Sequence, residues 1–313
     1  MKDQEAKLAF LNENGRPPLG HGRVDTFDPY KTLYFGADMK EDDSIGAVDF
    51  PAIWEQEIKK TLFMHWDGNN NSIDERNISA SLGAGAKPET VDLKRVNRIR
   101  EWLMKLRHPD YPFKRDDALA QQGKAVYRAY CAGCHEPSYG PPFGEVEKLL
   151  TDLKTDPRRI ESFGGTFKPG KDWSEDHPEL LDQDGKAKMV DAMNTLGEAY
   201  AWKFSHFRVT DGYANRPLEG IWARAPYLHN GSVPNLRALL DSNRPASFFR
   251  GYDVYDPEKV GFVVTVEKSA GRVMSKYDTA LPGNSNAGHS GKIYGTELSE
   301  QDKHALIEYL KTK

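Results

Sequence analysis

The segment CAGCH at residues 131–135 constrains this chain more than any other feature, because it holds both of the chain's cysteines. Two thiols three residues apart can add across the two vinyl groups of a haem, and the histidine that follows is then placed to ligate the iron. Cys131, Cys134 and His135 therefore predict one covalently attached haem c, with His135 as an axial ligand of the iron.

Zinc binding, thiol redox chemistry and chance account for the motif less well. Zinc sites commonly combine two CxxC-type pairs, and this chain has no second pair, so zinc would need Cys131, Cys134 and two histidines. A thioredoxin-like redox motif should follow a strand in a βαβ pattern, whereas this one follows an expected helix. Chance does not account well for the fact that both cysteines fall within one motif.

The helix expected at 116–130 leads directly into Cys131, with one of two aspartates at its start as the N-cap. Gly123 and Tyr127 precede Cys131 by two turns and one turn, so the three residues share one helix face. A C-terminal helix that begins at Ser299 is the expected partner of this face. An ordinary amphipathic helix pair would look similar, and the adjacent CAGCH motif favours a haem-bearing pair.

Hydrophobic periodicity predicts further helices at about 52–64, 89–107, 186–202 and 233–240, and one clear strand at 261–266. The 27 glycines and 19 prolines predict long loops between these elements. We therefore expect a mainly α, loop-rich fold: a cytochrome c-like helical haem domain with long loop insertions and little β structure.

The proline-containing break HPDYPF at 108–113 predicts a division of the chain into two parts. Residues 1–115 would form a loop-rich N-terminal segment with two helices. Residues 116–313 would form the cytochrome c-like haem-binding domain.

The charge balance excludes some classes of partner. The chain has 43 basic and 47 acidic residues, a net charge of −4, and shows no nucleic-acid footprint. No apolar run approaches the roughly 20 residues that a membrane span needs. The first residues, MKDQEAKLAFLNENG, lack the apolar core of a secretory signal. Because haem c is attached outside the cytoplasmic membrane, we expect a periplasmic or secreted protein whose signal is not part of this sequence.

A second axial ligand should be a histidine or methionine beyond the CAGCH motif. Met189 and Met193 lie four residues apart in an expected helix, a spacing more typical of a core. His206, between aromatic residues, is more typical of packing. His229 lies in a polar-aromatic loop, and His289 lies in a glycine-rich loop just before the last helix. The residues alone leave the choice between these two open.

Several stretches resemble a known family. PYLHNGSVPNLRALL (226–240), which follows LEGIWARA (218–225), is similar to a segment of the bacterial di-haem cytochrome c peroxidase superfamily. Together with GRVDTFDPYK (22–31), HWDGNNNSIDERNISASLGAG (65–85) and GHSGKIYGTELS (288–299), it most resembles the rubber-oxygenase-like branch. Members of that branch carry two haem c groups. One transfers electrons and has two histidine ligands, and the other is where oxygen or peroxide reacts.

The resemblance implies that Cys131, Cys134 and His135 correspond to the second, C-terminal CxxCH of the family. It also implies that His289 is the distal ligand, with His229 as the alternative. Four further residues would line the haem or bind its propionates, unless they merely close their loop: Trp222, Arg224, Tyr227 and Asn230.

This chain departs from the family in having one CxxCH where the family has two. The first haem domain would lie upstream of residue 1, and residues 1–85, with Phe63, His65 and Trp66, would cover the distal face of its haem. Either the chain is the C-terminal part of a di-haem protein, with a second haem domain as its partner, or it is a mono-haem descendant with a separate redox partner protein.

We expect a c-type cytochrome that binds one haem and transfers electrons through a low-spin, bis-histidine iron. The alternative is a haem peroxidase or oxygenase with an open iron, in which His229 or His206 acts with Arg224 as acid/base and charge-stabilising groups. A third hypothesis is a purely structural haem that supports an interface with a partner.

Two expectations concern local contacts. A carbonyl of Pro141 or Pro142 is expected to accept a hydrogen bond from the free ring nitrogen of His135. The Asn- and Asp-rich stretch 67–75 does not match an EF-hand loop, so a turn is expected there rather than a calcium site.

Overall fold

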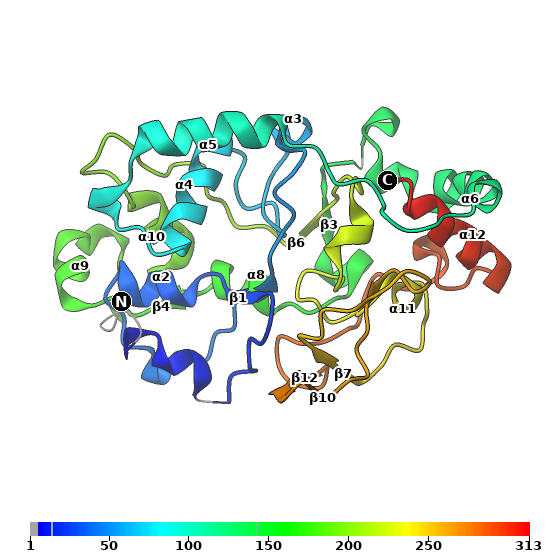
Figure 1. Cartoon of the computed structure of the whole chain (residues 1–313). Helices are drawn as coiled ribbons and strands as arrows, with labels where there is room; N and C mark the ends of the chain where they lie inside the picture. Colours follow the sequence, from blue (N-terminus) through cyan, green and yellow to red (C-terminus); the bar gives the residue numbers. More distant parts are fainter. Residues whose placement is uncertain (1–5, 14, 142) are drawn as a thin grey trace.

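The computed structural model describes residues 6–13, 15–141 and 143–313, and it consists of short helices and short strands joined by long loops (Figure 1). The α-helices are α2 (Asp28–Leu33), α3 (Gln56–Lys59), α4 (Ile73–Gly83), α5 (Leu93–Lys105), α6 (Asp117–Tyr130), α7 (Ala132–His135), α8 (Arg158–Gly164), α9 (Lys171–Asp176), α10 (Met189–Thr195), α11 (Leu236–Leu239) and α12 (Glu300–Leu310). The 3₁₀-helices are η1 (Ala9–Asn12), η2 (Met39–Glu41), η3 (Pro88–Thr90), η4 (Pro137–Tyr139), η6 (Pro178–Leu180), η7 (Ile221–Arg224) and η8 (Lys292–Tyr294), and η5 (Leu149–Leu153) is a π-helical turn.

The strands pair into two-stranded antiparallel ribbons. The pairs are β1 (Arg23–Asp25) with β2 (Ala47–Asp49), β3 (Val146–Lys148) with β6 (Gly212–Ala214), β4 (Thr166–Phe167) with β5 (Ala187–Lys188), β7 (Ser247–Arg250) with β12 (Ser275–Asp278), β8 (Tyr255–Asp256) with β9 (Gly261–Phe262), and β10 (Lys268–Ser269) with β11 (Arg272–Val273).

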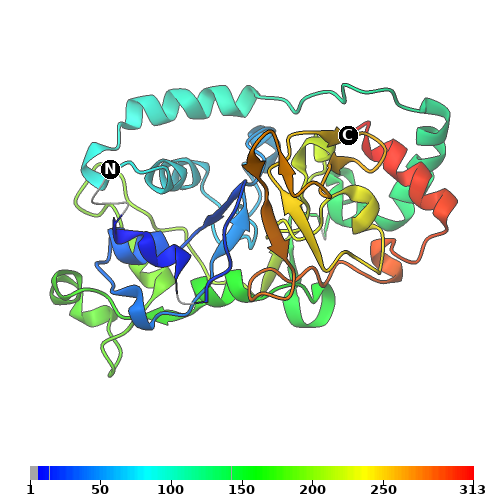
Figure 2. The same ribbon diagram turned by 60° about the horizontal axis from the view of Figure 1, so that its bottom comes forward.

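These elements form two lobes. One lobe contains α2, α4 and α5 together with α8, α9 and α10, and the other contains α6, α11 and α12 (Figure 1). Figure 2 shows α5 along one edge of the molecule and the extended segment after it crossing to α6 in the second lobe. Within the described residues, no helix combines the length and the apolar character that crossing a membrane requires.

The core of the first lobe joins distant parts of the chain. Phe27 packs on Phe163 with ring centroids 4.7 Å apart, and Met189 and Met193 are fully buried in the same cluster. The two methionines are therefore core residues, as their spacing predicted. Because residues 163–207 pack with the N-terminal part, this core draws on both sides of residue 115. The division of the chain at that residue stays a prediction.

The core of the second lobe lies between α6, α11 and α12. The two long helices begin where the sequence predicts. The carboxylate of Asp116 accepts a hydrogen bond from the Leu119 N–H at 2.9 Å, and the hydroxyl of Ser299 accepts one from the Asp302 N–H at 3.1 Å. These N-caps satisfy backbone donors that an uncapped helix end leaves open.

The expectation of a mainly α fold with little β structure is wrong. The chain is 38% helical and 12% strand, with six small sheets among the described residues. Each strand has only two to four residues, too few to produce a recognisable alternating pattern. Several ribbons also pair strands that are far apart in the sequence, such as β3 and β6. No hairpin turn in the sequence therefore indicates these pairs.

Three expected elements are much shorter than predicted. The helix at 52–64 is reduced to α3, because Glu55 adopts a left-handed backbone conformation just before it. The helix at 186–202 is reduced to α10, which begins after strand β5 and ends before Gly197, a glycine with a φ of +88°. The strand at 261–266 is confirmed only at its first two residues, in β9.

The contact between α6 and α12 generates a stability prediction. A Cβ atom on Gly123 would lie 1.8 Å from the carbonyl oxygen of Ala305, so Gly123→Ala should force the helices apart and lower the free energy of unfolding by about 3 kcal/mol. Denaturant unfolding of the haem-loaded protein measures this. Gly83→Ala is the matched control, since its Cβ would come no closer than 3.9 Å to the Tyr30 hydroxyl. Equal midpoints for the two variants would contradict the close packing.

Candidate functional site

A cavity of about 200 Å³ lies at the C-terminal end of α6 and brings together most of the residues singled out by the sequence. Cys131, Cys134 and His135 line one side, and His289 lines another. Leucine side chains from α11, α12, η5 and the segment before α11 make up much of the remaining wall. The site is therefore a largely apolar pocket with two thiols and facing imidazoles, which is the composition that a covalently bound haem requires.

The α6–α12 contact positions the cysteines. Gly123 lets the backbone of α12 approach α6 closely, and one turn further along Tyr127 packs on Tyr309 with ring centroids 5.0 Å apart. Tyr127 is almost fully buried, so the end of α6 is held rigidly where Cys131 begins the motif. The predicted face of α6 and its partner helix are confirmed by these contacts.

His135 is oriented by a backbone carbonyl. Its Nδ1 donates to the carbonyl oxygen of Arg216 at 2.6 Å, which leaves Nε2 with a free lone pair. Burial lowers the pKa of His135, so the ring is neutral near pH 7 and its lone pair is available to a metal. The expected carbonyl acceptor at Pro141 or Pro142 is thus wrong: the acceptor comes from a segment 81 residues away, and Pro142 lies outside the described residues.

His289 faces His135 across the cavity. Their ring centroids are 6.4 Å apart and the ring planes are inclined by 45°. Two imidazoles that ligate one metal from opposite sides keep their ring centres about 6 Å apart, because each metal–nitrogen bond is about 2.0 Å long. The spacing of the two rings therefore fits a haem iron between them.

The surroundings of His289 also suit a ligand. Burial, and then the proximity of His135, lower the pKa of His289 to about 3, so the ring is neutral. Its Nδ1 is buried without a hydrogen-bond partner in the described part of the chain, an unusual state for a buried polar atom. Its backbone φ of +47° is one that residues other than glycine rarely adopt, and such strain clusters at functional sites.

Arg244 holds the loop that carries His289. Its guanidinium donates to the carbonyl oxygens of Asn286 at 2.6 Å, Gly288 at 2.7 Å and His289 at 2.8 Å. It also reaches the Leu239 carbonyl at 3.1 Å, which ties the loop to the end of α11. This fork of donors fixes the backbone of a strained residue at the wall of the cavity.

The four residues that the resemblance places beside the haem differ in their positions. Arg224 and Tyr227 line the cavity, and the Tyr227 hydroxyl donates to the Ile221 and Val260 carbonyls. Trp222 and Asn230 do not line it. The Trp222 indole donates to the Pro109 carbonyl at 2.9 Å, and the Asn230 amide donates to the carbonyls of Gly283 and Ser285, so both close loops.

The other histidine candidates have protein partners. His229 is buried at the cavity wall, stacked on Tyr213 at 4.1 Å, and its Nε2 lies 3.0 Å from the Tyr213 hydroxyl. His206 lies outside the cavity and its Nδ1 pairs with the Glu75 carboxylate at 2.6 Å. Of these candidates, His289 alone combines a position opposite His135 with a ring nitrogen that has no partner among the described residues.

The environment of the cysteines does not resemble a reactive or metal-binding thiol site. Both thiols are free, and burial raises the pKa of Cys131 to about 12 and that of Cys134 to about 11. Reactive thiols have lowered pKa values. Among the residues that the structure describes, no three His, Cys, Asp or Glu side chains gather as a metal site would need. The zinc and thioredoxin-like hypotheses therefore gain no support.

Some important residues were not found from the sequence. Arg216 supplies the carbonyl that orients His135, Arg244 clamps the His289 loop, and Tyr294 packs on His289 with ring centroids 4.7 Å apart. The arginines act through contacts with distant backbone, which no local pattern reveals. Tyr294 lies in the same GHSGKIYG stretch as His289, so the resemblance of this stretch to the family could also have indicated Tyr294.

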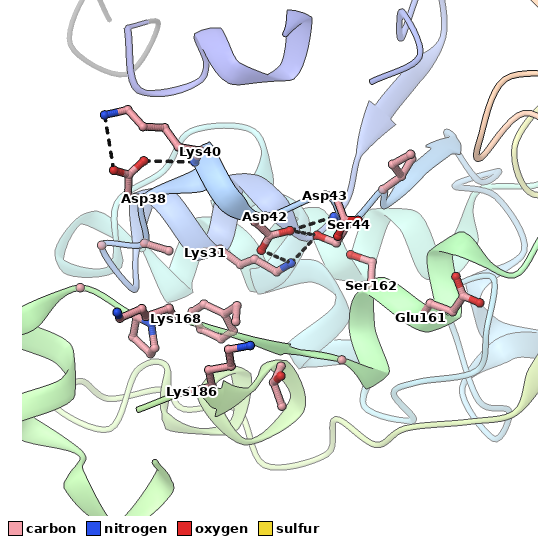
Figure 3. Close-up of a pocket in the computed structure, with 18 of the residues that line it drawn as sticks. Lys31, Asp38, Lys40, Asp42, Asp43, Ser44, Glu161, Ser162, Lys168 and Lys186 are labelled. Carbon is pink, nitrogen blue, oxygen red and sulfur yellow. Dashed lines mark hydrogen bonds and ion pairs between the residues drawn. The ribbon is translucent and has the colours of Figure 1, made fainter. Parts of the chain in front are cut away.

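A cavity of about 710 Å³ lies elsewhere, between the Lys31–Ser44 segment and the α8–β4 region in the first lobe (Figure 3). Lys31 in its wall is satisfied internally, with Asp42 at 3.0 Å and Ser44 at 2.6 Å. Its acidic and basic side chains are mixed, and neither cysteine of the motif lines it.

The polar stretch at 67–75 is a bend that leads into the first residues of α4, so the expected turn is found only in its first part. Asp67 forms an ion pair with Arg159 at 3.0 Å, and the Asn70 amide donates to Glu75 at 2.8 Å. The oxygens of this stretch are thus engaged with protein cations and amides.

The raised thiol pKa values predict slow alkylation. In haem-free protein from a host that does not attach haem c, iodoacetamide should modify the cysteines at pH 7.5 roughly 100-fold more slowly than in 8 M urea, since each unit of raised pKa lowers the thiolate fraction about tenfold. The alkylation rate of the folded protein should still rise with pH at values where an ordinary cysteine thiol is already ionised. Modification of the folded protein at the rate seen in urea, or faster, would contradict the buried, neutral thiols.

Comparison with known proteins identifies a related family and two relatives. Residues 212–250 match the family described as RoxA-like, cytochrome c-like. This segment contains Arg216, whose carbonyl orients His135, and also Arg224 and His229. Two uncharacterized proteins of Sinorhizobium fredii (strain NBRC 101917 / NGR234), y4iM and y4iJ, are each 30% identical to the chain. The alignments cover 85% and 94% of this chain, and they span 64% and 60% of the relatives' own lengths. The family match supports the rubber-oxygenase-like resemblance and a cytochrome c-type protein with covalently bound haem c.

Proposed function

We propose that this chain transfers electrons through a single haem c, attached to Cys131 and Cys134 and ligated by His135 and His289. The observation that carries the proposal is the pair of neutral imidazoles that face each other at 6.4 Å beside two free thiols. The cytochrome c-like match at 212–250 supports the same class of protein.

The protein's contribution is to hold both ligands in place. Arg216 fixes the ring of His135 through its carbonyl, and the Arg244 clamp fixes the backbone of His289. A bound haem c would supply one-electron chemistry, and two imidazole ligands would leave its iron no open position for a substrate. Rigid ligands suit electron transfer, because little has to move when the charge on the iron changes.

The walls of the cavity favour the same role. Leu306 and Leu310 of α12 and Leu236 of α11 are almost fully buried and exclude water from the interior. Cys134 and Tyr130 are partly exposed, so one edge of the site reaches the surface. An electron donor or acceptor could therefore approach this edge while the ligands stay enclosed.

The enzyme alternative needs a distal acid/base group beside an open iron. His229 is stacked on Tyr213 and bonded to its hydroxyl, and His206 is paired with Glu75 away from the cavity. These partners favour structural roles for both histidines. A peroxidase or oxygenase activity would then belong to a second haem domain. We propose such a domain as a partner because the family that the sequence resembles carries two haem c groups and this chain has one CxxCH. The chain spans less than two thirds of its relatives' length.

Haem c attachment outside the cytoplasmic membrane leads us to propose a periplasmic or secreted location. The proposed number of haems rests on the one CxxCH of the sequence.

The ligand assignment predicts a change of spin state. His289→Ala should convert a low-spin iron to a high-spin iron that binds cyanide rapidly, because one axial position opens. Visible and electron paramagnetic resonance spectra of the oxidised protein measure this. His229→Ala should stay low-spin, and His304→Ala, at an exposed position of α12, is the control. A low-spin His289→Ala protein together with a high-spin His229→Ala protein would reverse the assignment.

The Arg244 clamp predicts a positioning effect. Arg244→Lys keeps the charge and loses the fork of donors, so the His289 loop should open more often and cyanide should bind about tenfold faster or more, which corresponds to about 1.4 kcal/mol of lost restraint. Arg237→Lys is the control, because Arg237 pairs with Glu300 at the surface. Identical cyanide rates in the two variants would show that the clamp does not hold the ligand.

A further inference from the structure

A second, smaller cavity of about 50 Å³ adjoins the candidate haem cavity and is strongly basic. Lys59 of α3, Arg76 of α4, and Arg216 and Arg224 of the second lobe all line it. Arg216 and Arg224 also line the larger cavity, so the two cavities share a wall. The basic cavity thus lies where the two lobes meet, directly beside the candidate haem site.

The four cations have no acidic partner at contact distance among the described residues. Two of the nearby carboxylates are engaged elsewhere: Asp67 pairs with Arg159 at 3.0 Å, and Glu55 pairs with His108 at 2.9 Å. The charge of Glu219 acts on Arg224 without an ion pair between them, and one carboxylate oxygen of Glu219 is buried without a partner among the described residues. Within the described part of the chain, no ion pair joins Lys59, Arg76, Arg216 or Arg224 to any carboxylate. In a chain whose net charge is −4, this local excess of positive charge is unusual.

Hydrogen bonds to neutral groups satisfy these side chains only in part. Lys59 donates to the Trp54 carbonyl at 2.8 Å, Arg224 to the Pro217 carbonyl at 2.9 Å, and Arg76 to the Asn77 side chain at 3.0 Å. Arg216 donates through Nη2 to the His65 carbonyl, while its buried Nη1 has no partner among the described residues. Buried donors without acceptors are costly, and an anion is the acceptor that charged donors favour most.

The electrostatics of Lys59 agree with this geometry. Burial, and then the charges of Arg224, Arg216 and Arg76, lower the pKa of Lys59 to about 7. The cations therefore face one another closely enough to repel. A negative charge among them would relieve this repulsion and would raise the pKa of Lys59.

We propose that this basic cavity binds a carboxylate, and that the carboxylate is a propionate of the haem in the adjoining cavity. The ligand class follows from size and chemistry, since about 50 Å³ holds a carboxylate with one or two waters and arginine forks match carboxylate oxygens. The source follows from the shared Arg216 and Arg224 wall. This inference rests on the proposed haem site, and it adds Lys59 of α3 and Arg76 of α4 to the residues that would hold the cofactor.

Resonance Raman spectroscopy of the haem-loaded protein tests the proposal, because the propionate bending band responds to hydrogen bonds on the carboxylates. Lys59→Gln and Arg76→Gln should each shift this band. Lys60→Gln is the matched control and should not, since Lys60 is exposed and pairs with Glu57. Circular dichroism confirms that each variant is folded, and the use of two variants keeps the test valid if one fails to fold.

Added acetate distinguishes the two sources of a carboxylate. If a propionate fills the cavity, sodium acetate should raise the melting temperature of the haem-loaded protein no more than sodium chloride does. An unshifted Raman band, together with an acetate effect that Lys59→Gln abolishes, would overturn the haem as the source. An unshifted band without an acetate effect would overturn the carboxylate site itself. The proposed function fails separately, through a high-spin spectrum or the lack of haem.

Discussion

The close approach of α6 and α12 is the contact on which the candidate site depends. Gly123 has no side chain, and the backbone of α12 at Ala305 occupies the space that a side chain would need. Because α6 ends at Tyr130, the position of α6 against α12 also determines where Cys131 lies. It also places Leu306 and Leu310 as a wall of the cavity. A single residue without a Cβ atom thus links helix packing to cofactor binding.

The chain end strengthens the same arrangement. Lys313 donates through Nζ to Glu136, directly after the CAGCH motif, at 2.7 Å. Its backbone carbonyl accepts from the Gly220 N–H at 2.6 Å, at the start of the segment that leads to Arg224. Lys313, just after the last helix, therefore connects the CAGCH motif to the segment that begins at Gly220. A cavity bounded by three segments so distant in sequence depends on such long-range contacts.

Burial gives the two histidines their chemical character. An enclosed wall disfavours charge, so the pKa values of His135 and His289 are lowered and both imidazoles stay neutral near pH 7. The same enclosure concentrates the cations Lys59, Arg76 and Arg216 at the neighbouring wall. Neutral ligands beside a positive patch are an arrangement suited to a cofactor that carries an iron at its centre and carboxylates at its edge.

Sequence reasoning succeeded where the signal was local. The CAGCH motif, the shared face of Gly123 and Tyr127, and the Ser299 cap each depend on residues a few positions apart, and the structure bears out the helix contacts. It failed for the fold class, because strands of two to four residues paired over long separations leave no periodic pattern. It also missed Arg216 and Arg244, which act through backbone that only the folded chain brings near.

The spectrum of the oxidised protein from a haem c-maturing host tests the central claim most directly, when it is combined with a haem count and the intact mass. A bis-histidine haem c site predicts one thioether-bound haem per chain and a low-spin signal without the long-wavelength band of sulfur ligation, as two nitrogen ligands require. A high-spin signal would contradict the bis-histidine site. A mass without haem would contradict the assignment of Cys131 and Cys134 as attachment points.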